Sequence, residues 1–300
     1  MAGVGRAEQG GAAVQDVQGQ RVRALLPGMR RLLVAFAGLT VLGFTALFIG
    51  STQTERAFAW TIDPPLTAAF LGAGYGAGCV LVLLALRARA WVHARVAVVT
   101  VLVFMLFTLL ATGLHLDRLH FAAPDLLARA AAWFWTAVYV LVPIAMLALL
   151  PLQERVPGGD PPRLVPLPRA LSAVLAVQGT LMLAVGAVLF AFPASQSILW
   201  PWQLTPLTSR TVGSWLIAFG FAAWLALRER DLERLELAAI AYTAFGTLEL
   251  VALVRFLGVV RWGQPAAWVY LALLLTIVPT GVVGWAAVRR TVPRGGRPSW

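Results

Sequence analysis

Glu249 is the residue whose type and position most clearly indicate chemistry, because it interrupts a long run of apolar residues. A carboxylate inside a membrane span is costly and normally faces other helices or water, so we expect it to bind a ligand, carry a proton or pair with a cation. Tyr242, Gly246 and Glu249 have the i, i+4, i+7 spacing of one helical face, which places Tyr242 on the same side as the glutamate. The cations that could neutralise it near the interface are Arg118, Arg210 and Arg255.

Two histidines and an acid follow another apolar run, at His115, Asp117 and His120, with Arg118 among them. These residue types can bind a metal ion or act as acid and base in an enzyme. On a continuous helix, however, positions 115, 117 and 120 point in different directions and do not converge. We therefore expect no metal and no cofactor, and interpret the four residues as interfacial polar groups that could line a ligand site.

Trp60 and Trp202 each precede a proline-containing turn. Most tryptophans of membrane proteins anchor helices at the two interfaces, and the alternative here is a lid over a cavity. Each turn places a capping side chain before a proline at the first helical position, where the missing N–H is harmless. The predicted helix-start residues are Asp63, Pro64, Pro65, Thr205 and Pro206.

The elements that must position these residues are membrane helices. Hydrophobic residues make up 60% of the 300 residues and charged residues 12%, against roughly 45–50% and about 25% in ordinary globular proteins. A spanning helix needs about 20 mostly apolar residues. The sequence therefore predicts an all-α integral membrane protein in contact with the lipid bilayer, with eight transmembrane helices near residues 31–50, 65–86, 96–116, 129–150, 170–192, 208–227, 236–254 and 266–288.

The net charge of +11 comes from 24 basic residues, all of them arginine. In an eight-helix topology, alternate flanking segments hold 18 and 6 of these arginines. Positively charged flanks stay in the cytoplasm, so we expect both termini there and the protein in the cell membrane. Because this rule already accounts for the charge, nucleic acid is excluded as a partner.

An internal duplication is indicated by a shift of 141 residues. Residues 65–89 and 206–230 then share 10 of 25 positions without a gap, including Pro-Leu-Thr at the start and two arginines at the end. Four helices per unit make the two units parallel rather than inverted repeats. The expected organisation is a disordered tail, a first repeat, a Pro/Gly-rich cytoplasmic linker, a second repeat and a second tail, over residues 1–28, 29–150, 151–169, 170–290 and 291–300.

Three functions are compatible with these features. Duplication and an intramembrane acid favour a small-molecule or lipid-binding protein of transport type, with an outward-facing site between the repeats lined by Glu249, His115, Asp117 and Arg118. A non-catalytic membrane subunit or scaffold, with a membrane-protein partner, is the second possibility. A membrane-embedded enzyme that uses His115 or His120 at the outer surface is the third, and it lacks a paired nucleophile.

Overall fold

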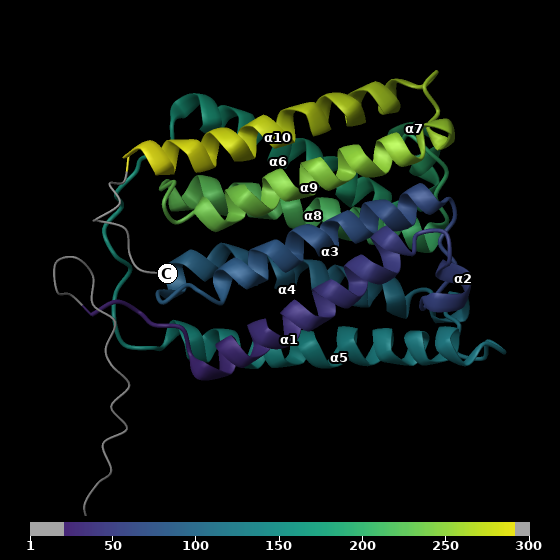
Figure 1. Ribbon diagram of the computed structural model, residues 1–300, viewed down its shortest axis with the longest axis horizontal. Coiled ribbons are helices and arrows are strands. Elements are labelled where there is room, and N and C mark those ends of the chain that lie inside the picture. Colours follow the sequence, from purple (N-terminus) through teal and green to yellow (C-terminus); the bar gives the residue numbers. More distant parts are fainter. Residues whose placement is uncertain (1–20, 292–300) are drawn as a thin grey trace, which may run out of the picture.

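The computed structural model describes residues 21–291, which form a bundle of long helices joined by short segments (Figure 1). No β-strand occurs within this range. The long helices are α1 (Pro27–Phe44, continued by the π-helical turn η1, Thr45–Ile49), α3 (Pro65–Ala85), α4 (Trp91–Gly113), α5 (Leu126–Glu154), α6 (Arg169–Ala191), α8 (Pro206–Glu229), α9 (Glu236–Arg255) and α10 (Pro265–Thr291). The short helices are α2 (Thr54–Ala57), η2 (Leu116–Arg118), η3 (Pro193–Ser195), α7 (Gln196–Leu199) and η4 (Leu257–Val259).

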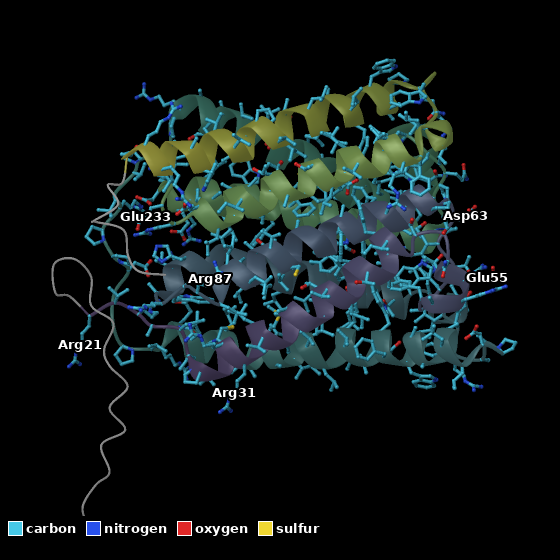
Figure 2. All side chains as sticks on the ribbon, in the orientation of Figure 1. Arg21, Arg31, Glu55, Asp63, Arg87 and Glu233 are labelled. Atoms are coloured by element: carbon cyan, nitrogen blue, oxygen red, sulfur yellow. The ribbon has the colours of Figure 1, made fainter. Side chains whose placement is uncertain are left out.

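Eight helices of 20 to 29 residues are long and apolar enough to cross a membrane, which is the pattern of a multi-pass membrane protein. Each of the eight predicted spans coincides with one of them. Because the number is even, the described chain begins and ends at the same end of the bundle (Figure 1). We call this the terminal end, and the opposite end, which carries α2 and α7, the distal end. Charged side chains gather at both, for example Arg21, Arg87 and Glu233 at the terminal end and Glu55 and Asp63 at the distal end (Figure 2).

Four helices form the centre of the bundle. Helix α3 packs against α9 and α4 packs against α8, so both contacts join the first half of the chain to the second. Helices α1, α5, α6 and α10 lie outside them against α3, α4, α8 and α9 respectively, and they are less buried. The order of long and short elements is the same in both halves. The tandem duplication that this order would reflect stays a prediction from the sequence.

Glycines permit the closest approaches between helices. A Cβ atom on Gly72 of α3 would lie 2.3 Å from the backbone nitrogen of Phe48, and one on Gly213 of α8 would lie 2.7 Å from the carbonyl oxygen of Gly186 in α6. Neither contact could exist with a larger residue, because both neighbours are backbone atoms. Small residues at the contact are how membrane helices gain packing without a hydrophobic driving force.

The two predicted helix starts differ in their capping. Helix α8 begins at Pro206 with a capping box, in which the Thr205 hydroxyl accepts the N–H of Thr208, as predicted. Helix α3 begins at Pro65, but its N-cap residue is Pro64 and no side chain caps it. The prediction that Asp63 caps this helix was wrong, because the second proline moves the aspartate one residue away from the capping position.

The segment between the halves, residues 155–168, is bound along the terminal end of the bundle. The N–H of Arg23 donates to the carbonyl of Gly159 at 3.0 Å, and the N–H of Leu232 donates to that of Val165 at 2.8 Å. This connecting segment is therefore attached both to the start of the first half and to the turn between α8 and α9. Residues 1–20 of the tail expected to be disordered, and residues 292–300 of the second tail, lie outside the described part of the chain.

Candidate functional site at the distal end

A pocket of about 420 Å3 opens at the distal end between the two halves of the chain. It contains six of the residues singled out by the sequence, and these come from three segments that are far apart in the chain. We call it the distal pocket and define it by its lining residues, which are Trp60, Thr61, His115, Asp117, Arg118, Thr205, Pro206 and Leu207.

The strongest polar contact at this pocket joins His115 to Arg210 of α8. Nη1 of Arg210 lies 2.6 Å from Nε2 of His115. Because a guanidinium group can only donate, the histidine nitrogen accepts this bond and the imidazole is neutral. Partial burial and the positive charges of Arg210 and Arg118 lower the pKa of His115, against an opposing effect of Asp117, which agrees with a neutral ring.

The electrostatic balance at the distal pocket is positive. Asp117 and Arg118 form an ion pair of 3.0 Å that is well exposed. Arg210 donates to a neutral histidine and forms no ion pair with a described acidic residue. One carboxylate therefore faces two guanidinium groups, and the excess charge is that of Arg210. An anionic group fits such a site because a guanidinium forms charge-assisted bonds with carboxylate or phosphate.

His120 positions the rim of the pocket rather than its lining. Its Nδ1 lies 3.0 Å from the carbonyl of Phe58 and its Nε2 lies 3.1 Å from the hydroxyl of Thr61. Its backbone N–H also donates to the carbonyl of Ala59. These three bonds bracket Trp60, so His120 fixes the segment that carries the tryptophan, and both ring nitrogens are occupied by that role.

Trp60 forms one wall of the distal pocket and is otherwise enclosed. Its side chain is 3% exposed, and its ring lies edge-to-face against Phe58 at 4.8 Å and Trp135 at 4.9 Å between centroids. Its Nε1 atom is buried and has no hydrogen-bond partner within the described chain. A buried indole N–H normally finds a partner, so this donor is left unsatisfied within the described chain.

Behind Trp60 lies a second, larger space of about 560 Å3, which we call the apolar groove. Phe58 and Trp135, the ring neighbours of Trp60, both line it. The groove runs between α1, α3, α4 and α5 and continues past the central helices towards α9 and α10. Residues that represent its lining are Phe36, Leu39, Gly78, Phe104, Trp135, Trp215, Phe219 and Phe245.

Glu249 lies in a different place from the one predicted. It is fully buried, accepts a hydrogen bond of 2.9 Å from the Tyr270 hydroxyl through Oε2, and has no partner for Oε1 within residues 21–291. Trp200 and Trp202 pack edge-to-face on Tyr270 and contribute to the enclosure of the carboxyl group. Glu249 therefore does not line the distal pocket, and its hydrogen-bond partner is a tyrosine.

The expected cationic partners of Glu249 are bound elsewhere. Arg210 contacts His115, Arg118 pairs with Asp117, and Arg255 donates to the Phe48 carbonyl. The interpretation that one of the three neutralises the glutamate was wrong, because each is held by a nearer acceptor. Trp202 is also not a lid, since it is 0% exposed and its Nε1 donates to Thr67 of the first half at 2.8 Å.

Tyr242 belongs to a polar group in the second half of the chain. Its hydroxyl donates to Oε1 of Gln178 at 3.2 Å, and Nε2 of the same glutamine donates to Thr276 at 2.9 Å and Thr280 at 3.3 Å. These bonds join α6, α9 and α10. Tyr242 thus bonds to α6 and Glu249 to α10, and neither residue lines the distal pocket.

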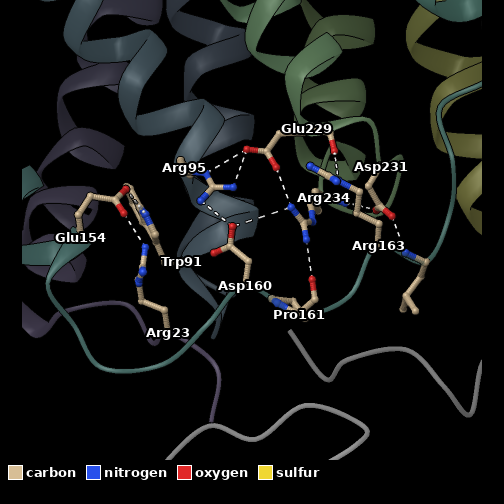
Figure 3. Close-up of polar contacts among 11 residues, drawn as sticks. Arg23, Trp91, Arg95, Glu154, Asp160, Pro161, Arg163, Glu229, Asp231 and Arg234 are labelled. Carbon is tan, nitrogen blue, oxygen red and sulfur yellow. Dashed lines mark hydrogen bonds and ion pairs between the residues drawn. The ribbon is translucent and has the colours of Figure 1, made fainter. Parts of the chain in front are cut away.

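The terminal end holds a charge network that the sequence interpretation missed (Figure 3). Arg95 of α4 pairs with Glu229 of α8 at 2.6 Å and with Asp160 of the connecting segment at 2.8 Å. Arg234 pairs with the same Glu229 at 2.9 Å and donates to the carbonyl of Pro161 at 2.5 Å. The network therefore joins both halves and the connecting segment through two shared carboxylates.

Two further acidic residues, Asp231 and Glu233, lie at the terminal end. Asp231 is 0% exposed and accepts the backbone N–H groups of Leu164 and Val165 at 2.5 and 2.9 Å. Glu233 is also buried, and its burial, followed by the charges of Asp231 and Glu236, raises its pKa to about 7 against an opposing effect of Arg234. The signal for this network was present in the sequence, where seven of the nine residues in 228–236 are charged.

No protein-family model, no curated protein and no solved structure matches this chain. Within residues 21–291, no group of three or more His, Cys, Asp or Glu side chains is placed to hold a metal ion. The distal pocket and the apolar groove behind it therefore remain the features from which a function can be inferred.

Proposed function

We propose that the protein is a multi-pass membrane protein of transport type that binds an anionic small molecule or lipid headgroup in the distal pocket. The observation that carries the proposal is the contact between Arg210 and His115 at 2.6 Å, at a pocket formed by both halves of the chain. It leaves a guanidinium charge without a carboxylate partner beside a space of about 420 Å3. Such a charge is satisfied by an incoming anion.

The orientation is part of the same proposal. The arginine-rich flanks of the spans lie at the terminal end, which the positive-inside rule assigns to the cytoplasm. The distal pocket then faces the outer side of the cell membrane, where it is accessible to a ligand outside the cell or in the outer leaflet. Tags on residues 1 and 300 that are both protected from an external protease in intact cells would support this orientation.

The enzyme alternative has less support. His115 uses Nε2 as an acceptor for Arg210, and His120 uses both ring nitrogens to hold the segment of Trp60. A general acid or base needs a free nitrogen within reach of the reacting group, which His120 lacks and His115 has only at Nδ1. No feature of the described residues specifically favours the scaffold alternative.

The test compares binding of two short-chain lipids to the full-length protein in neutral detergent, by thermal stabilisation. Dioctanoyl phosphatidylglycerol carries a net negative charge, and dioctanoyl phosphatidylcholine does not. We expect the anionic lipid to bind the wild type more tightly, and Arg210→Gln to weaken that binding by about tenfold or more, which corresponds to a lost charge-assisted bond.

Arg56→Gln is the matched control, because Arg56 is an exposed arginine of the same end that does not line the pocket. Its binding of phosphatidylglycerol should equal that of the wild type. Equal affinity of the wild type for the two lipids, or an equal effect of both substitutions, would rule out the distal pocket as an anion site.

A further inference from the structure

We infer that the ligand of the distal pocket is an amphiphile: its anionic head binds beside Arg210 and its alkyl chain lies in the apolar groove, with Trp60 as the movable partition between the two. This inference rests on the proposed function and specifies the substrate class. It follows from three observations: the adjacency of the two spaces, the chemistry of the groove, and the state of Trp60.

A cluster of three aromatic side chains, Trp60, Phe58 and Trp135, lies between the two spaces. Trp60 lines the distal pocket, while its ring neighbours Phe58 and Trp135, at 4.8 and 4.9 Å, line the groove. The contacts of Trp60 across this cluster are made by side chains, so in our inference a movement of the Trp60 ring connects the charged pocket to the apolar groove.

The groove is suited to an alkyl chain and unsuited to water or a polar ligand. Its lining is aliphatic and aromatic apart from a few hydroxyl groups. Of these, the hydroxyls of Tyr75 and Tyr139 bond to each other at 2.5 Å, so they require no outside partner. A chain in the groove would gain about 0.8 kcal/mol for each methylene removed from water.

The groove also has an opening towards the membrane. Leu42 of α1 and Phe134 of α5 line it and are 51% and 48% exposed, so its rim lies on the outer surface between these two helices, which cross in Figure 1. An amphiphile in the outer part of the bilayer would reach the groove with its chain and the pocket with its head. A free anion would use the pocket alone.

Trp60 has a reason to leave its observed position. Its Nε1 atom is buried with no hydrogen-bond partner in the described chain, which costs free energy that a ligand oxygen would recover. An anionic head in the pocket can accept this bond while its chain occupies the space beyond. The same residue would then contact both parts of the ligand.

The test uses two alkyl phosphates with the same head, propyl phosphate and dodecyl phosphate, and measures binding to the full-length protein in neutral detergent. Ala131 lines the groove on α5, so Ala131→Trp fills part of it without changing the pocket. We expect this variant to bind dodecyl phosphate at least about tenfold more weakly than the wild type does, with propyl phosphate unchanged. The variant and the wild type are compared with the same ligand, so the partition of that ligand into detergent micelles is the same in both measurements.

Ala191→Trp is the matched control, because Ala191 is exposed at the distal end of α6 and does not line the groove. It should bind both phosphates as the wild type does. Trp60→Phe keeps a ring but removes the N–H group, and it should weaken both ligands by a similar factor of about threefold to tenfold.

The outcomes separate the two proposals. If propyl phosphate binds and depends on Arg210 but Ala131→Trp leaves dodecyl phosphate unaffected, the amphiphile inference is overturned and the anion pocket stands. If Arg210→Gln affects neither phosphate, the anion pocket fails, and the inference with it. Equal weakening of both phosphates by Ala131→Trp would also contradict the groove as the site of the chain.

Discussion

The two ends of this bundle use charged side chains in opposite ways. At the terminal end, Arg95 and Arg234 share Glu229, and each charge of this partly buried network faces another of opposite sign. At the distal end, Arg210 donates to a neutral His115 and its charge stays uncompensated beside an open pocket. Closed ion networks fix a structure, whereas an uncompensated cation at a cavity is suited to a ligand. On this difference we base the proposal that the terminal end has a structural role and that the distal end binds a ligand.

The largest expected effect tests the structural end. Arg234→Met leaves Glu229 and Asp160 with one cation between them in a buried position, and removing one partner of such a network should destabilise the protein by about 3 kcal/mol. Thermal unfolding in detergent measures this loss. Arg31→Met, at an exposed arginine of the same end, should melt with the wild type; a similar loss in both variants would show that the network contributes nothing specific.

The next effect is the pH dependence of the same end. Because burial raises the pKa of Glu233 to about 7, the folded state keeps a proton that the unfolded state releases near the ordinary value of about 4.3. Stability should therefore fall as pH rises from about 4.3 to 7. Glu233→Gln has no such proton, and at pH 8 it should exceed the wild type by on the order of 1 kcal/mol.

The informative quantity is the difference between Glu233→Gln and the wild type at pH 5 and at pH 8, since other groups titrate equally in both. The groups that surround Glu233 are Asp231, Glu236, Arg234 and His93. If the stability difference between Glu233→Gln and the wild type is the same at pH 5 and pH 8, the pKa of Glu233 is the same in the folded and the unfolded state.

A smaller effect sharpens the assignment of the distal end to binding. Burial, Arg210 and Arg118 lower the pKa of His115, so the free protein holds a neutral ring, whereas a bound anion favours the imidazolium form. Binding then takes up a proton, and affinity for propyl phosphate should rise as pH falls below about 6.5, by less than tenfold. The second ionisation of propyl phosphate, at about pH 6, affects every variant equally. His115→Gln retains an acceptor for Arg210 and should remove the part of the pH dependence that exceeds this common effect. A steep pH profile in the glutamine variant would point to another group.

The smallest effect is expected at the exposed ion pair of the distal end. Arg118 and Asp117 have side chains that are 72% and 68% exposed, and such pairs contribute little because water screens them. Arg118→Gln should change the free energy of unfolding by no more than about 0.5 kcal/mol. A loss as large as that of Arg234→Met would remove the contrast between the two ends.

The eight spans could be predicted from the sequence because a bilayer imposes one length and one composition on every crossing. The start of α8 at Pro206 could be predicted as well, since a threonine cap is a local signal within four residues, Thr205 to Thr208. The start of α3 shows the limit of that signal, because the adjacent prolines moved Asp63 out of the capping position. Capping patterns depend on a few neighbouring residues and can therefore be recognised in a sequence. They mislead when one additional residue moves the capping side chain out of position.

The sites were less predictable because their partners are distant in the chain. Arg210 and His115 are 95 residues apart, and Glu249 and Tyr270 belong to different helices. The terminal network was hidden for another reason: the positive-inside rule explains arginines at helix ends by counting them, and it gives no weight to acids beside them. The alternating charges of residues 228–236 indicate ion pairing only when Arg95 and Asp160 are known to lie opposite.

The attachment of the connecting segment has a mechanical consequence. It is tied to the first half through Arg23 and to the second through Leu232, so the halves are fastened together at the terminal end. At the distal end they are joined by side-chain contacts, among them Trp202 to Thr67, Arg255 to Phe48 and Arg210 to His115. A rocking motion of one half against the other would therefore have its hinge at the terminal end and its widest travel at the mouth of the distal pocket.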